Sequence, residues 1–275
     1  MSYRPKFRIT SRLLSQIDDI AVTREAILAS TTRATWTPAQ RPEGRRVRNT
    51  HSSSGFDGKS FTLEKVLALA NGQDFPIVTE RSERQLLTHF SKRLSVGRTS
   101  GRVNWTHEDV LKLHKVIARG EVMDQRPAGR YRTINVRAGR FVPPPPSEVS
   151  RLMCELLEWW NTKALELSAV VTSAIVHYRI SDIHPFPDGN GRVGRALALW
   201  ELYRNGFDSH SIFSLNEHYW GERRHYYAAL RAVYHQGEDL TGWLEYSAEG
   251  LRLALERIQL RTQQQSSLLL RPTLE

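Results

Sequence analysis

The sequence predicts a mainly helical protein, on two observations. Apolar residues recur at helical spacing along most of the chain, and caps or turn signals separate these segments. The exception is residues 131–142, where β-favouring residues flank an Ala138–Gly139 turn, so we expect a small β-hairpin there. Prolines at 143–146 would end the hairpin, because proline lacks the N–H that a ladder needs.

The expected helices follow in chain order. The first spans 9–28, where Leu13, Ile17 and Ile20 recur at close to helical period. Thr106 is placed to cap another helix. The remaining predicted ranges are 62–70, 79–94, 107–119, 147–162, 164–182, 190–205, 218–236 and 241–260.

Composition excludes several classes of protein. The 275 residues are 40% hydrophobic and 25% charged, which is typical of a globular chain and not of a disordered one. No apolar run reaches the length of a membrane span, and the N-terminus lacks the apolar stretch of a secretory signal. A single cysteine, Cys154, excludes an internal disulfide framework and a cysteine-rich metal site, and its apolar neighbours predict a buried thiol. We therefore expect a cytoplasmic protein without a membrane partner.

A net charge of +10 suggests a polyanionic partner such as nucleic acid. The first fifty residues hold ten Lys+Arg and four Asp+Glu. Residues 125–147 hold five arginines and no acid, and Arg137 and Arg140 flank the predicted hairpin turn. This second run is either an ordinary solvated face, a docking surface for an acidic target, or a means of steering an anionic substrate.

Residues 183–195, with the sequence IHPFPDGNGRVGR, carry the strongest candidate site. They form a tight loop between two apolar helices, and a loop that feeds a helix N-terminus makes an anion site. Arg192 and Arg195 share a face of the first helical turn, where both can hold phosphates. Asp188 could hold Mg²⁺ together with substrate phosphates, and His184 could accept a proton near pH 7. This combination indicates phosphoryl or nucleotidyl transfer.

These residues resemble the Fic domain family, whose signature is H-P-F-x-[D/E]-G-N-G-R-x-x-R. All nine largely fixed positions match, from His184 to Arg195. The resemblance extends over about residues 9–255. Residues 127–132 look like the opening of the family's flap, and residues 224–230 look like its Tyr–Tyr segment beside the nucleotide base. The resemblance implies the Fic fold, a multi-helix core with a small β-hairpin flap.

The resemblance also implies protein AMPylation, the transfer of AMP from ATP–Mg²⁺ to a Ser, Thr or Tyr hydroxyl of a target protein, and of this chain itself, with release of pyrophosphate. By position, His184 would deprotonate the hydroxyl and Asp188 would bind Mg²⁺. The flap would dock the target by strand addition. The implied nucleotide-binding residues are Gly189, Asn190, Gly191, Arg192, Arg195, Tyr226 and Tyr227, and the implied flap residues are Ile134, Val136, Arg137 and Arg140.

Residues 48–59 are similar to the family's inhibitory motif, [S/T]-x-x-x-E-[G/N]. Ser53 and Gly58 fit, but Asp57 stands where the motif has Glu. The shorter side chain predicts weaker autoinhibition, and a loop without a regulatory role is the alternative. The resulting domain prediction is an N-terminal helical region over 1–105, a catalytic core over 106–260 and a tail over 261–275.

Two further functions compete with AMP transfer. One is a related reaction that uses another nucleotide or removes AMP, although the family's phosphorylating branch carries Lys where this chain has Gly191. The other is a basic nucleic-acid-binding or regulatory module whose Fic-like site is idle. The resemblance also allows a homo-oligomer, and the target's identity is not encoded in any feature of the sequence.

Overall fold

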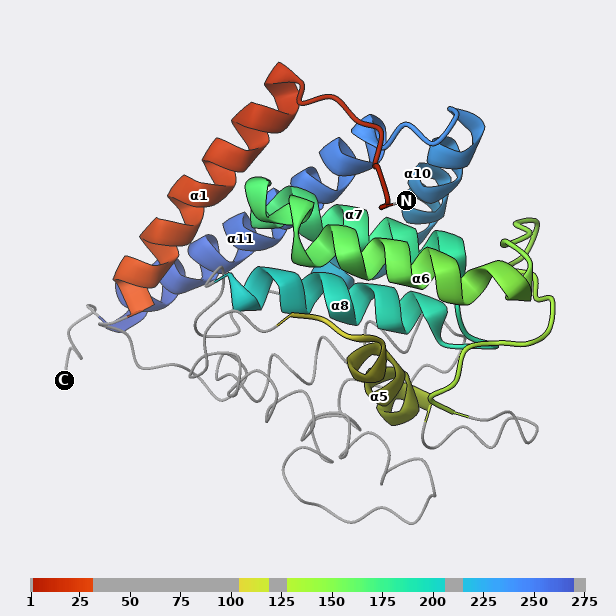
Figure 1. The fold of residues 1–275 in the computed structure, drawn as a ribbon. Coiled ribbons are helices and arrows are strands. Elements are labelled where there is room, and N and C mark those ends of the chain that lie inside the picture. Colours follow the sequence, from red (N-terminus) through yellow and green to blue (C-terminus); the bar gives the residue numbers. More distant parts are fainter. Residues whose placement is uncertain (1, 32–103, 119–127, 206–214, 270–275) are drawn as a thin grey trace, which may run out of the picture. The chain divides into compact units, whose positions relative to one another are not determined.

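A computed structural model describes residues 2–31, 104–118, 128–205 and 215–269 (Figure 1). The described residues form helices and no strand, which confirms the mainly helical prediction. They group into two compact units, one made of 2–5, 104–118 and 128–205, the other of 6–31 and 215–269. The predicted helices at 62–70 and 79–94 lie outside the described residues, and the predicted domain boundaries stay a prediction.

The first unit contains four α-helices and one 3₁₀ helix. Thr106 and Asp109 form a reciprocal capping box at the start of its first helix, because each backbone N–H bonds to the other side chain at 3.2 Å. The predicted helix at 164–182 is divided, because Ser168 adopts an extended backbone and caps the second part. The elements are α5 (His107–Ala118), α6 (Pro146–Asn161), η1 (Lys163–Glu166), α7 (Ala169–Ile183) and α8 (Asn190–Arg204).

Helix α7 is the core of this unit and packs against both α6 and α8 (Figure 1). Eleven of its fifteen residues are buried, which matches its nearly continuous apolar sequence. Its contact with α8 is close at Gly194, where an added Cβ would lie 3.2 Å from the carbonyl oxygen of His177. Close packing here fixes the distance between the C-terminal end of α7 and the N-terminus of α8.

The β-hairpin predicted at 131–142, hereafter the flap segment, is not formed as a strand pair. Its one backbone pairing joins Ala138 and Phe141, which exchange two hydrogen bonds of 3.1 Å around Gly139. The Arg132 side chain takes the carbonyl groups of Ile134 and Pro144, and the prolines at 143–146 have no N–H to donate. A β-ladder at the base of the loop would therefore lack free carbonyl acceptors, which Arg132 occupies, and N–H donors, which the prolines do not have.

The second unit contains α1 (Ser11–Thr31), α9 (Leu215–Gly221), α10 (Arg223–His235) and α11 (Thr241–Leu269). Helix α1 lies along α11, and Gln16 donates to Glu249 at 3.1 Å between them. The predicted helix at 218–236 is two helices that meet at Glu222. Helix α11 continues beyond its predicted end at residue 260 into the region expected to be a tail.

The structure can be compared with two sequence expectations, a buried Cys154 thiol and the absence of a membrane-spanning segment. Cys154 is exposed, contrary to the prediction of a buried thiol, because it occupies the outer face of α6 while Met153 and Leu157 point into the core. Among the described helices, none combines the length and apolar character needed to cross a bilayer.

Replacing Gly194 with Val should destabilise the protein, because the new side chain would meet the His177 carbonyl in the α7–α8 contact. Overpacking of this kind costs about 1–3 kcal/mol, and each kcal/mol lowers the unfolding midpoint by roughly 2–4 °C in a chain of this size. Gly242→Val is the matched control, because no atom lies within 4 Å of the added Cβ there. Equal thermal midpoints for the two variants would contradict the close packing.

Candidate active site

The candidate site is the signature loop, residues 184–189, which joins α7 to α8. His184 ends α7 in the left-handed region, with φ 52° and ψ 55°, and its N–H still bonds to Ile180. Pro185 follows and cannot continue a helix. Asn190 then begins α8. The candidate base and the candidate anion site are therefore placed by the facing ends of two packed helices.

The Asn190 side chain closes this loop through two hydrogen bonds. Its carbonyl oxygen accepts the Phe186 N–H and its amide donates to the Phe186 carbonyl, both at 2.8 Å. Phe186 and Asn190 are both almost fully buried, so these bonds form away from solvent. The side chain of Asn190 thus holds the loop, and its backbone N–H remains the group that could bind an anion.

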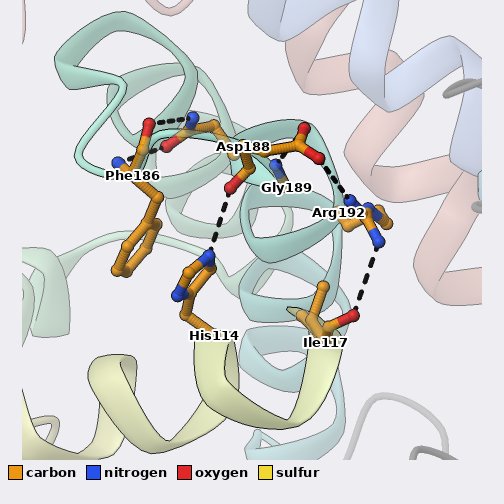
Figure 2. A network of polar contacts seen from close by, with 7 residues as sticks. His114, Ile117, Phe186, Asp188, Gly189 and Arg192 are labelled. Atoms are coloured by element: carbon orange, nitrogen blue, oxygen red, sulfur yellow. Dashed lines mark hydrogen bonds and ion pairs between the residues drawn. The ribbon is translucent and has the colours of Figure 1, made fainter. Parts of the chain in front are cut away.

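His114 of α5 supports the loop from below, and sequence reasoning did not single it out. Its ring stacks on Phe186 with centroids 3.8 Å apart, and its Nε2 lies 3.1 Å from the Asp188 carbonyl oxygen (Figure 2). The N–H of Gly129 donates to Nδ1 at 2.9 Å, so Nδ1 is unprotonated and Nε2 donates to Asp188. In the sequence, His114 lies at helical spacing from Val110 and Leu113. This spacing indicates that His114 is buried but does not identify the residues that it contacts.

The imidazole of His184 is held in one tautomer. Its Nδ1 lies 3.1 Å from the carbonyl oxygen of Ser181, which can only accept, so Nδ1 carries the proton. Burial is the largest effect and lowers the pKa of His184. The hydrogen bond to Ser181 raises this pKa by less, and the charges of Arg132 and Asp188 lower and raise it by smaller amounts still. Neutral His184 therefore offers an unprotonated Nε2 at pH 7, which a general base requires.

Asp188 and Arg192 face each other across the first turn of α8 (Figure 2). One carboxylate oxygen of Asp188 accepts the Gly189 N–H at 2.6 Å, and the other lies 3.4 Å from Arg192 Nη2. The first backbone bond of α8 runs from Val193 to Gly189, so the N–H groups of 190–192 lie in the turn that has no intrahelical acceptor. The N-terminus of α8 and Arg192 are both positive, so they suit a phosphate group. The carboxylate of Asp188 lies beside them and suits a cation bound to that phosphate.

The second arginine of the motif, Arg195, is buried, with 3% of its surface exposed. Its guanidinium lies over Gly191, because a Cβ added at that glycine would be 3.0 Å from Nη1. A side chain at position 191 would therefore displace Arg195.

The described residues hold no group of three His, Cys, Asp or Glu side chains that could bind a metal by themselves. Mg²⁺ commonly takes one or two carboxylates and completes its shell with water and substrate phosphates. The Asp188 side chain is 45% exposed and beside the candidate phosphate site, so it fits a Mg²⁺ ion that arrives with a nucleotide.

Not all predicted site residues are brought together. Tyr226 and Tyr227 belong to the other unit, where Tyr226 is buried and Tyr227 is exposed, so their nucleotide role stays a prediction. In the flap segment, Ile134, Arg137 and Arg140 are exposed and Val136 is half-buried. The regulatory candidates Ser53, Asp57 and Gly58 lie outside the described residues, as does the whole of 48–59.

Comparison with known proteins places residues 104–202 on the model of the Fic/DOC family. The chain is 32% identical over 152 residues to protein adenylyltransferase fic-1 of Caenorhabditis elegans, which covers 54% of this chain and 28% of that protein. It is 30% identical over 165 residues to protein adenylyltransferase Fic of Aedes aegypti, which covers 58% and 33%. The matches thus span about a third of these relatives.

Solved structures agree with the fold. A Fic family protein from Desulfovibrio desulfuricans G20 superposes with a TM-score of 0.79 at 27% identity, over 96% of this chain and 78% of that chain. A Fic-domain signalling protein from Bacteroides thetaiotaomicron superposes with a TM-score of 0.66 at 18% identity, over 92% and 98%. The second comparison supports the fold alone.

The support that His114 gives the loop should depend on pH. Burial lowers the pKa of His114 from 6.5 to about 4, so between these values the unfolded chain binds more protons than the folded one. The stabilisation is complete above pH 6.5 and is lost as the pH falls toward 4. His114→Phe keeps a stacked ring but does not titrate. Between pH 7 and 4, wild type should therefore lose on the order of 2–3 kcal/mol more unfolding free energy than the variant; parallel urea-denaturation profiles would contradict this.

Proposed function

We propose that the chain, whose residues 104–202 match the model of the Fic/DOC family, transfers AMP from ATP to a hydroxyl side chain of a protein. The observation that carries this proposal is the tautomer of His184, whose Nδ1–H is bound to Ser181 and whose Nε2 is left to accept a proton. This base lies one short loop away from a helix N-terminus with Asp188 and Arg192. Relatives named protein adenylyltransferase support the same activity.

The proposed reaction is an in-line displacement at the α-phosphorus of ATP. Nε2 of His184 takes the proton of the target hydroxyl as its oxygen bonds to the α-phosphorus. The bond from the α-phosphorus to the α–β bridging oxygen breaks, and its electron pair leaves with pyrophosphate. The products are the AMP ester of the target and pyrophosphate. His184 is neutral before the reaction and imidazolium after it, so it must release its proton to solvent before the next turnover.

The phosphates are proposed to lie on the first turn of α8. Its N–H groups at 190–192 and the guanidinium groups of Arg192 and Arg195 would hold them, and such groups stabilise developing charge without reorganisation. The Gly189 N–H joins this set once its bond to the Asp188 carboxylate opens. Mg²⁺ held by Asp188 and the phosphates would neutralise charge on the pyrophosphate.

Gly191 favours nucleotidyl transfer over the alternative that uses a lysine at this position. The close approach of Arg195 Nη1 leaves no room for a side chain without displacing a phosphate ligand. ATP is the proposed nucleotide, with Tyr226 and Tyr227 as the proposed contacts of its base. Removal of AMP stays the alternative reaction, and self-association and a cytoplasmic location stay predictions from the sequence.

The protein target is proposed to bind at the flap segment by adding a strand to it. Ile134 and Val142 are 50% and 61% exposed, so apolar side chains are available to a partner chain. The exposed arginines Arg137 and Arg140 lie between them. An extended target segment with acidic residues matches this surface in shape and charge.

His184→Ala should abolish the transfer. With Mg²⁺ and ATP labelled at the α-phosphate, wild type should place label on itself or on proteins of a cell lysate, and the variant should lose about 10²–10⁴-fold in rate. His235→Ala, which removes an exposed histidine at the end of α10, is the control. Because the pKa of His184 is lowered, the midpoint of the acidic fall in the wild-type rate should lie below pH 6.5. Label that persists in His184→Ala would refute the assigned base.

Charge reversal on the flap segment should weaken target capture and leave ATP binding intact. Arg137→Glu with Arg140→Glu is expected to lower kcat/KM for the protein target by about 10-fold or more at low salt, because electrostatic steering is lost. Affinity for a non-hydrolysable ATP analogue should stay the same. Arg231→Glu in α10 is the control for net charge. Unchanged target kinetics in the double variant would contradict docking at this surface.

A further inference from the structure

Arg132 is a buried arginine whose role the proposed reaction does not use. Its residue surface is 3% exposed, although it begins the flap segment, where the other arginines are exposed. In the part of the chain that the structure describes, its side chain bonds to four backbone carbonyl oxygens and to no carboxylate. Burying a guanidinium is costly, and only a complete set of acceptors offsets that cost.

Two of these carbonyls belong to the C-terminal end of α7. Arg132 Nε donates to the His184 carbonyl at 2.7 Å and Nη2 to the Ile183 carbonyl at 3.3 Å. The backbone N–H of Arg132 adds a bond of 2.9 Å to Pro185. The last carbonyls of a helix lack intrahelical partners and carry the negative end of its dipole, which a cation stabilises. Helix α7 has no basic residue in its own last turn, so Arg132 supplies the cap from a distant part of the sequence.

The other two carbonyls belong to Ile134, near the start of the flap segment, and to Pro144, just after its end. Nη1 donates to the Ile134 carbonyl at 3.2 Å, and Nη2 donates to the Pro144 carbonyl at 2.5 Å. A β-ladder would join the two sides of a hairpin here, but the prolines have no N–H to donate to it. One planar guanidinium therefore replaces the ladder and joins both ends of the loop to the helix end that carries His184.

We propose that Arg132 is the positioning residue that fixes the flap segment against His184, so that a hydroxyl presented on the flap reaches Nε2. The inference rests on the proposed AMP transfer and adds a residue to it. The link is rigid because a guanidinium has five donors in one plane, and it spans only backbone atoms. Lysine cannot reproduce it, because an ammonium group is a point charge without the fork.

Two variants separate alignment from charge. Arg132→Met removes both the charge and the donors, and Arg132→Lys keeps the charge but not the fork. Both should lower label transfer to protein by about 10- to 100-fold, the cost of a displacement near 1 Å. Affinity for a non-hydrolysable ATP analogue and release of free AMP to water should fall far less, because neither needs the flap. Arg130→Met, an exposed neighbour, is the control.

The outcomes are distinct. Preferential loss of protein labelling in Arg132→Lys supports alignment, while full activity in Arg132→Lys shows that charge alone matters and overturns it. A parallel fall of protein labelling, AMP release and nucleotide affinity marks a purely structural role and also overturns it. If wild type shows no label that depends on His184, the proposed function fails instead.

A measurement on wild type does not depend on whether the variants fold. The Nε–H of Arg132 donates to a backbone carbonyl and the residue is buried. Measured by ¹⁵N NMR, the hydrogen on Arg132 Nε should therefore exchange with solvent far more slowly than the hydrogen on Nε of exposed Arg130. The same labelled sample reports the Nδ1–H tautomer of His184, which Arg132→Lys should perturb at equal temperature. Fast exchange of Arg132 Nε–H in folded wild type would overturn the proposed link.

Discussion

The pair of hydrogen bonds between the Asn190 amide and the Phe186 backbone is the interaction on which the rest of the site depends. It closes a loop that must reverse direction between two closely packed helices, and it does so in the buried interior, where an unmade bond is expensive. With the loop closed, Phe186 is fixed against His114 and Asp188 is brought to the first turn of α8. The end of α7 then supplies the candidate base, and the N-terminus of α8 supplies the candidate anion site.

Charge in this region is arranged so that the base stays neutral. Arg132 and burial both disfavour the imidazolium form of His184, and desolvation does the same to His114. The arginines lie on the nucleotide side, on α8, and under the helix end, on the segment that follows Gly129. A positive environment of this kind binds phosphate and at the same time keeps a histidine unprotonated. The two requirements of the proposed reaction are therefore met by different arginines, Arg192 and Arg195 toward the phosphates and Arg132 toward His184.

The sequence was sufficient to predict features formed by neighbouring residues. It was insufficient to predict contacts between residues that are far apart in the chain. The helix from Asn190, the loop before it and the closeness of Asp188 to Arg192 follow from residues within one short motif. The partners of His114 and Arg132 are 74 and 52 residues away, and helical periodicity carries no information on such pairs. The flap segment was mispredicted because β-propensity was judged without the arginine that takes its carbonyls. Ser168 and Glu222, which divide two predicted helices, act through backbone conformations that apolar spacing does not register.

The left-handed backbone conformation of His184 is tolerated by few residue types, and this restriction is independent of proton transfer. An ordinary L-residue loses about 1–2 kcal/mol in that conformation, whereas asparagine adopts it readily. Alanine at 184 thus removes the base and also strains the turn that leads into the loop, and a β-branched residue would strain it more. Asparagine removes the imidazole while tolerating the turn. Between an alanine and an asparagine variant, the difference in residual activity would therefore measure backbone preorganisation separately from chemistry.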